Sequence, residues 1–102
     1  MNVVARSRLE AFWRNPLYKD SEQALKAWHA EATRASWTSP QDIKNQYRNA
    51  SIVGNNRVVF NIKGNDYRLI VAVAYDFGAL YVKFIGTHKQ YDAVDAATVE
   101  ME

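Results

Sequence analysis

The sequence contains no cysteine, and among its 102 residues only four are glycine and two are proline. The absence of cysteine excludes a disulfide framework, a thiolate nucleophile and a zinc site with cysteine ligands. Because the chain has only two histidines, His29 and His88, we do not expect a zinc site built from protein side chains. The low glycine and proline content excludes collagen-like and low-complexity proteins.

Long hydrophobic runs are also missing. No apolar run reaches the about 18 residues that a membrane span needs, and the first residues lack the apolar segment of a signal peptide. We therefore expect no membrane contact and a cytoplasmic location. Hydrophobic residues nevertheless make up 48% of the chain, which is enough for a core, and the length predicts a single domain over residues 1–102.

The net charge is only +2, but the charges are unevenly distributed along the chain. Residues 44–89 hold seven basic residues and two acidic ones, whereas residues 90–102 hold four acidic residues and no basic one. A basic middle region indicates a polyanionic partner such as RNA or DNA. The alternative is an ordinary solvated surface of mixed charge. The acidic tail would then face away from the RNA.

The first half of the chain has helical patterning. Asp20, followed by Gln23 three residues later, predicts an N-terminal cap for a helix over residues 21–36. The three tryptophans are interpreted as packing residues. The other expected elements are a shorter helix ending before Pro16, a helix from Ser39 to about Gln46 and a short strand over residues 2–5.

The second half alternates apolar and polar residues, which predicts strands over residues 57–62, 67–75 and 80–85. Gly64-Asn65 is a dipeptide suited to positive φ in a tight turn, and residues 76–79 form a second turn. We therefore expect an antiparallel meander covered on one face by the helices, which is an α+β fold.

The lengths of the two turns predict the strand register. The first turn pairs Asn61 with Arg68, and the second pairs Ala72 with Lys83. The predicted core face of the sheet then consists of Val58, Phe60, Ile62, Tyr67, Leu69, Val71, Val73, Leu80, Val82 and Phe84.

The opposite face of the predicted sheet gathers Arg57, Arg68 and Lys83 around Asn61, with no acidic residue beside them in the strands. Like charges placed close together in a sheet are destabilising. We therefore expect an anion to offset these charges.

A cluster of functional side chains follows the last strand, where His88, Lys89 and Tyr91 lie within four residues. If Thr87 caps a helical turn, His88 and Tyr91 lie on the same side of it. Histidine can transfer protons, tyrosine can stack on a base, and a fixed arginine such as Arg68 can stabilise the charge on a cleaved phosphodiester. These groups would cleave RNA without a metal or cofactor. Each also has an ordinary structural interpretation as a surface histidine, an ion-paired arginine or a packing tyrosine.

Two runs of residues carry a resemblance to a known family. Residues 59–70, VFNIKGNDYRLI, and residues 81–92, YVKFIGTHKQYD, resemble the HigB toxins of type II toxin–antitoxin systems, which are related in fold to the RelE toxins. The resemblance implies a small antiparallel sheet on N-terminal helices. It also implies an mRNA interferase that cleaves mRNA on the ribosome, and a HigA-type helix-turn-helix antitoxin as partner. Promoter DNA would be bound only through the complex with that antitoxin.

The resemblance assigns Arg68 to transition-state stabilisation, His88 to proton transfer and Tyr91 to base stacking or proton positioning. Two other classes of function stay open, a non-catalytic RNA- or ribosome-binding module and a protein–protein module that docks an acidic peptide on the basic face. The residues that we expect to bind RNA are Arg57, Asn61, Lys83 and Lys89.

Overall fold

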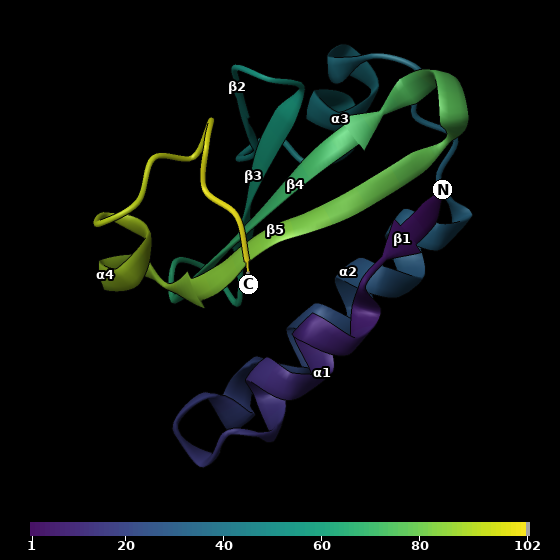
Figure 1. The fold of residues 1–102 in the computed structure, drawn as a ribbon. Helices are drawn as coiled ribbons and strands as arrows, with labels where there is room; N and C mark the ends of the chain where they lie inside the picture. The colour runs from purple at the N-terminus through teal and green to yellow at the C-terminus, as the bar shows by residue number, and fades with distance from the viewer. Residues whose placement is uncertain (102) are drawn as a thin grey trace.

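The computed structural model describes residues 1–101 and shows helices packed beside one twisted sheet (Figure 1). The elements follow in the order β1 (Asn2–Val4), α1 (Arg6–Arg14), the 3-10 helix η1 (Pro16–Ser21), α2 (Glu22–Arg34), α3 (Pro40–Gln46), β2 (Ser51–Val53), β3 (Arg57–Ile62), β4 (Tyr67–Ala74), the 3-10 helix η2 (Tyr75–Phe77), β5 (Ala79–Thr87) and α4 (His88–Tyr91).

The sheet has the strand order β1-β5-β4-β3-β2. Strands β3, β4 and β5 form the expected antiparallel meander. Strand β2 pairs antiparallel with β3, whereas β1 pairs in parallel with β5 and makes the sheet mixed. The predicted α+β class and the strand near the N-terminus are confirmed. Strand β2 was not predicted, because three residues are too few to show a two-residue period.

The core lies between the helices and one face of the sheet. Leu9 of α1 and Leu25 of α2 are fully buried there, and the rings of Trp28 and Trp37 lie 5.4 and 6.2 Å from that of Phe60. All three tryptophans are buried, so their interpretation as packing residues is confirmed.

The start of α2 differs from the prediction. The helix begins at Glu22 after η1, and the Asp20 carboxylate does not cap it. Asp20 instead accepts hydrogen bonds from the Tyr67 hydroxyl and, at 2.7 Å, from Lys63 Nζ. A contact between distant parts of the chain has thus replaced the local cap. The cap by Ser39 is confirmed, because its side chain accepts from the backbone N–H of Asp42 at the start of α3.

The β3–β4 register matches the prediction, with Asn61 opposite Arg68 and Arg57 opposite Ala72. The backbone of the turn does not match. Lys63 and Gly64 have positive φ values of 52° and 64°, whereas Asn65 does not have positive φ.

The predicted β4–β5 register is wrong. Ala72 lies opposite Tyr81 rather than Lys83, because η2 ends at Gly78 in the left-handed conformation and lets Ala79 pair with Ala74. A bulge between Ile70 and Val71 then adds one residue to β5.

The bulge reverses the facing of the rest of β5. Phe84 lies opposite Ile70 on the outer face, and Gly86 lies opposite Arg68. Ile85 occupies the core position predicted for Phe84. The prediction of Phe84 as a core residue is therefore wrong, because one inserted residue moves every later side chain to the other face.

Candidate functional site

The guanidinium of Arg68 is held by the turn between β3 and β4. Its Nη2 donates to Asn65 Oδ1 at 2.8 Å, and its Nη1 donates to the carbonyls of Asn65 and Tyr67 at 3.1 and 3.2 Å. Arg68 is only 8% exposed. All three acceptors are uncharged, so the hydrogen bonds fix the guanidinium without neutralising its positive charge.

Helix α4 places Tyr91 against Arg68, with the guanidinium carbon 5.8 Å from the centre of the tyrosine ring. The predicted cap is confirmed, because Thr87 and Gln90 form a reciprocal capping box at 3.1 and 2.9 Å. His88 belongs to the same helical turn, and its side chain is 52% exposed. Its Nε2 lies 3.6 Å from Asp92 Oδ1, so a carboxylate lies beside an accessible imidazole.

The Gln90 side chain anchors α4 to the N-terminal part of the chain, because its Nε2 donates to the Tyr18 hydroxyl at 3.1 Å. Gly86 provides the space for this arrangement. A Cβ atom at Gly86 would lie 2.6 Å from the Phe84 ring and 2.7 Å from Gln90 Oε1. Phe84 is partly exposed on the outer face, two residues before Gly86, which lies opposite Arg68. The sequence analysis missed this aromatic residue because it did not predict the bulge.

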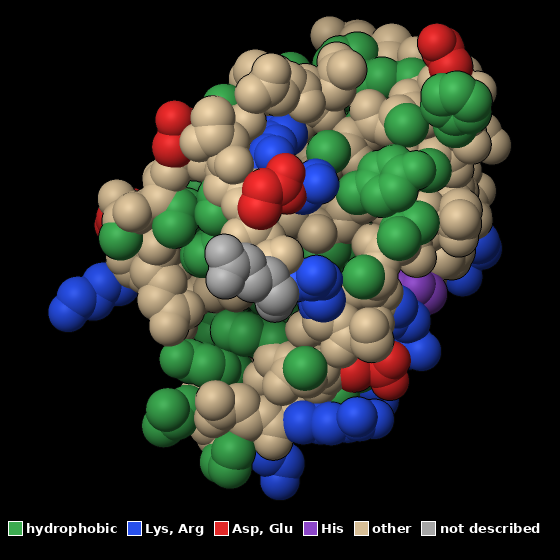
Figure 2. All heavy atoms as spheres, in the orientation of Figure 1, with side chains coloured by type: hydrophobic (Ala, Val, Ile, Leu, Met, Phe, Trp, Pro, Cys, Tyr) green, Lys and Arg blue, Asp and Glu red, His purple; other side chains and the backbone are tan. Residues whose placement is uncertain are grey.

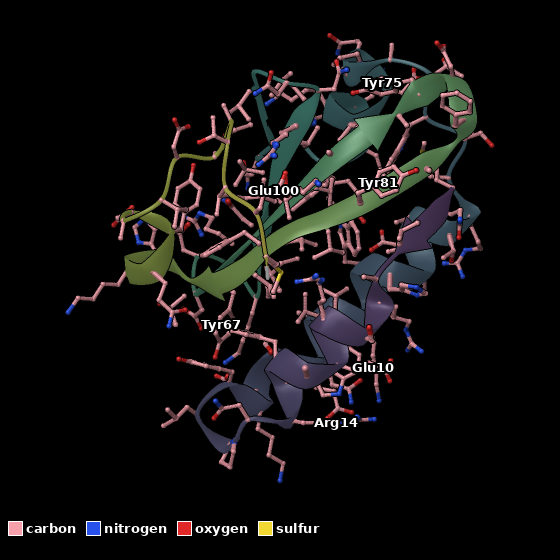
Figure 3. All side chains as sticks on the ribbon, in the orientation of Figure 1. Glu10, Arg14, Tyr67, Tyr75, Tyr81 and Glu100 are labelled. Carbon is pink, nitrogen blue, oxygen red and sulfur yellow. The ribbon has the colours of Figure 1, made fainter. Side chains whose placement is uncertain are left out.

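Arg57 and Lys83 form a separate cationic cluster around Glu100 on the same face of the sheet as Arg68. Glu100 Oε1 lies 3.0 Å from Arg57 Nη2, and Glu100 Oε2 lies 2.9 Å from Lys83 Nζ. Figure 2 shows acidic and basic side chains close together on this face, and Figure 3 shows the labelled Glu100 in front of the sheet. The hydrogen bond from Lys83, with the charges of Lys83 and Arg57, lowers the pKa of Glu100 below its ordinary value.

The segment that carries Glu100 is attached to the sheet through Arg57, whose side chain is 7% exposed. Arg57 Nη1 donates to the carbonyls of Ala96, at 3.3 Å, and Val99. Asn55 Nδ2 donates to the carbonyl of Ala97 at 2.7 Å. The acidic tail therefore crosses the basic face. Glu100 supplies the expected anion to Arg57 and Lys83 from within the chain, whereas the hydrogen-bond acceptors of Arg68 are uncharged.

The predicted site residues thus separate into two places. Arg68 and Tyr91 meet, with His88 on the same helical turn and Asn61 opposite Arg68. Arg57 and Lys83 meet around Glu100. Lys89 is exposed on α4. Sequence reasoning also missed Asn65, whose signal was its place three residues before Arg68.

Asn61 borders a cavity of about 330 Å³ that Arg48 and Gly64 also line. A separate groove of about 700 Å³ lies over α1, η1 and α2, with Trp13 among its lining residues. The Nζ of Lys26 and the guanidinium carbon of Arg6 lie 5.6 and 6.0 Å from the Trp13 ring. The other charged groups of this groove are Glu10, Arg14, Lys19 and Glu22.

Among residues 1–101, no group of three or more histidine, aspartate or glutamate side chains is arranged as a metal site. In the same part of the chain no helix has the length and apolar character needed to cross a membrane.

Comparison with known proteins adds one finding. Residues 21–94 match the family model of the HigB toxins, described as the RelE-like toxic component of a toxin–antitoxin system. No curated protein matches the sequence. The match extends from α2 through α4. It includes Arg57, Arg68, Lys83, His88 and Tyr91 but not Glu100. Because it covers well over half of the chain, the protein belongs to the HigB family of RelE-like toxins and has an antitoxin as its partner.

Proposed function

We propose that this chain, as one toxin domain over residues 1–102, is an endoribonuclease that cleaves mRNA on the ribosome and so inhibits translation. The observation that supports this proposal best is the Arg68 guanidinium, which keeps its charge and lies beside Tyr91 and the turn that carries His88. A fixed, uncompensated cation of this kind is one of the groups that stabilise the negative charge of a phosphorane.

In the proposed reaction, the RNA 2′-hydroxyl loses its proton and its oxygen attacks the adjacent phosphorus. The bond from phosphorus to the 5′-oxygen breaks, the 5′-oxygen takes up a proton, and the products are a 2′,3′-cyclic phosphate and a 5′-hydroxyl. The imidazole of His88, which lies 3.6 Å from the Asp92 carboxylate, transfers protons. Arg68 stabilises the additional negative charge, and Tyr91 stacks on a base or positions a proton.

Partners are proposed on the same basis. The antitoxin is of the HigA type with a helix-turn-helix domain, and promoter DNA is bound only through the complex of toxin and antitoxin. The working place is the ribosome in the cytoplasm. The groove over α1 and α2 supports ribosome binding, because four cationic side chains outnumber two acidic ones along it and ribosomal RNA is a polyanion. Two of the four cations, Arg14 and Lys26, form ion pairs with Glu10 and Glu22.

The proposal is tested by mapping the 5′ ends of one reporter mRNA after expression of the wild type, Arg68→Ala or Arg34→Ala. The reporter carries an intact or a destroyed start codon. Cuts in the translated reporter only, present with Arg34→Ala and absent with Arg68→Ala, support a ribosome-dependent nuclease with Arg68 in its site. Arg34 is an exposed arginine at the end of α2 and is the matched control. Cuts in both reporters would instead indicate a free ribonuclease.

A non-catalytic RNA- or ribosome-binding module is the second candidate. The low exposure of Arg68 favours the binding module, because three hydrogen bonds of the guanidinium go to protein acceptors and fewer donors are left for RNA. Inhibition of translation without any cut, in wild type and His88→Ala alike, would support this module and contradict the nuclease.

A further inference from the structure

We propose that Arg57 and Lys83 form a phosphate-binding subsite for single-stranded RNA, and that the Glu100 carboxylate occupies this subsite in the free protein. The inference rests on the proposed function in taking RNA as the ligand. It adds that the tail of this chain competes with that RNA for the two cations.

The geometry of the cluster is that of an anion site. Two cations from neighbouring regions of the sheet converge on one carboxylate, with Lys83 Nζ within hydrogen-bond distance of both oxygens, at 2.9 and 3.2 Å. Arg57 Nη2 takes one of the same oxygens at 3.0 Å. A phosphate diester presents two charged oxygens of similar spacing, and arginine and lysine both bind phosphate well.

Arg57 is also held by the backbone of the tail segment, and not by the Glu100 carboxylate alone. Its other terminal nitrogen donates to the carbonyls of Ala96 and Val99, and its side chain is almost fully buried. If the Glu100 side chain leaves, these bonds keep the guanidinium in place. The subsite is therefore preorganised for another anion.

Glu100, in contrast, is the exposed member of the cluster. Its side chain is 56% exposed and that of Lys83 is 26% exposed, so water and salt screen their attraction. Without an anion, the two cations would repel each other. These observations predict an exchange in which a phosphate replaces the carboxylate.

The position of the subsite suits a strand of RNA that also reaches Arg68. Ala72, the strand partner of Arg57, is four residues from Arg68 on β4, and both residues belong to the outer face. Four residues of a strand span about 13 Å. One short oligonucleotide can therefore contact both clusters.

The test is equilibrium binding of a short single-stranded RNA whose 2′-hydroxyls are methylated so that it cannot be cleaved, measured by fluorescence anisotropy over a range of salt concentrations. Glu100→Gln removes the competing charge and is expected to bind severalfold more tightly than wild type at low salt. Because each additional phosphate contact adds about 0.7 to the slope of log K against log salt, the slope is expected to steepen by about that amount. Asp76→Asn is the matched control, because it also removes one negative charge, from an exposed residue of η2. Its gain in affinity is expected to be smaller than that of Glu100→Gln.

Lys83→Ala added to Glu100→Gln should cancel both the gain in affinity and the steeper slope. Glu100→Ala provides a second removal of the carboxylate, and circular dichroism checks that each variant is folded. Equal affinity and slope for Glu100→Gln and Asp76→Asn would overturn the subsite, and so would a gain that survives Lys83→Ala.

The proposed nuclease is judged separately, by the mapped cuts. If wild type cuts mRNA while Glu100→Gln binds like Asp76→Asn, only the subsite is refuted. If no cuts occur while Glu100→Gln shows the gain, the subsite stands and the nuclease is refuted.

Discussion

Arg57 and Arg68 lie on neighbouring strands and on the same face of the sheet, and both are nearly buried. They differ in whether a carboxylate compensates the positive charge. Both donate to backbone carbonyls. The third partner of Arg57 is the Glu100 carboxylate, whereas that of Arg68 is the Asn65 amide. A carboxylate compensates the charge and an amide only fixes its direction. The contrast indicates which arginine is ready to act on an anion as the protein stands and which must first lose an internal one.

The largest expected effect is that of Arg68→Ala, which removes the uncompensated charge. If cleavage depends on this cation, the rate of mRNA cleavage on programmed ribosomes should fall by about a hundredfold or more, the usual effect of losing a group that stabilises transition-state charge. Arg68→Lys should retain part of the rate, because it keeps the charge but not the fixed geometry. A rate for Arg68→Ala within threefold of wild type would contradict the assignment.

Asn65→Asp gives Arg68 a carboxylate partner of the kind that Arg57 has. The geometry is preserved while the charge is compensated, so kcat should fall about tenfold to a hundredfold. Asn65→Ala removes the acceptor and should lower kcat less, because the charge remains and two carbonyls still hold the guanidinium.

Asn45→Asp on the exposed side of α3 controls for the added negative charge. Equal kcat values for Asn65→Asp and Asn45→Asp would show that the neutrality of the acceptor does not matter.

Gly86→Ala tests the packing next to Arg68. The added methyl group would overlap the Phe84 ring and the Gln90 amide, so we expect the free energy of unfolding to fall by about 1–3 kcal/mol, the usual cost of overpacking. Urea denaturation measures the change. Gly54→Ala is the control, because the nearest atom to its added Cβ would be Ala97 Cβ at 3.9 Å. Equal stability of the two variants would show that Phe84 and Gln90 move away without cost.

The smallest effect is expected in the free energy of unfolding at alkaline pH, and it involves Tyr67 on the core side of the β3–β4 hairpin. Burial, with the hydrogen bond to Asp20, raises the pKa of Tyr67 to about 12. An unfolded tyrosine loses its proton near pH 10, so between pH 10 and 12 the unfolded state binds fewer protons than the folded state. The free energy of unfolding should therefore decrease as pH rises through this window.

Tyr67→Phe should make this decrease shallower, measured by urea denaturation at several pH values. Tyr81→Phe, on the exposed part of the sheet, should leave it unchanged. A decrease with pH that is identical in Tyr67→Phe and wild type would contradict the role of this hydroxyl.

The regions that sequence reasoning described well are those in which neighbouring residues decide the structure. Thr87 and Gln90 cap α4 within four residues, and Ser39 caps α3 in the same way. The β3–β4 register follows from one short turn, so the pairing of Asn61 with Arg68 was predictable.

The regions that it missed depend on distant parts of the chain. Asp20 does not cap α2 and instead accepts hydrogen bonds from Lys63 and Tyr67, more than forty residues away. The bulge in β5 depends on how that strand packs against β4, and it moves Phe84 from the core to the outer face.

Turns, caps and alternation act over a few residues, so local sequence was enough for the α+β class, the resemblance to HigB toxins and the placing of His88 and Tyr91 in one helical turn. Which cations stay uncompensated follows from the packing of distant segments. That outcome depends on where the tail places Glu100, 43 positions from Arg57 and 17 from Lys83, and no local pattern encodes contacts over such separations.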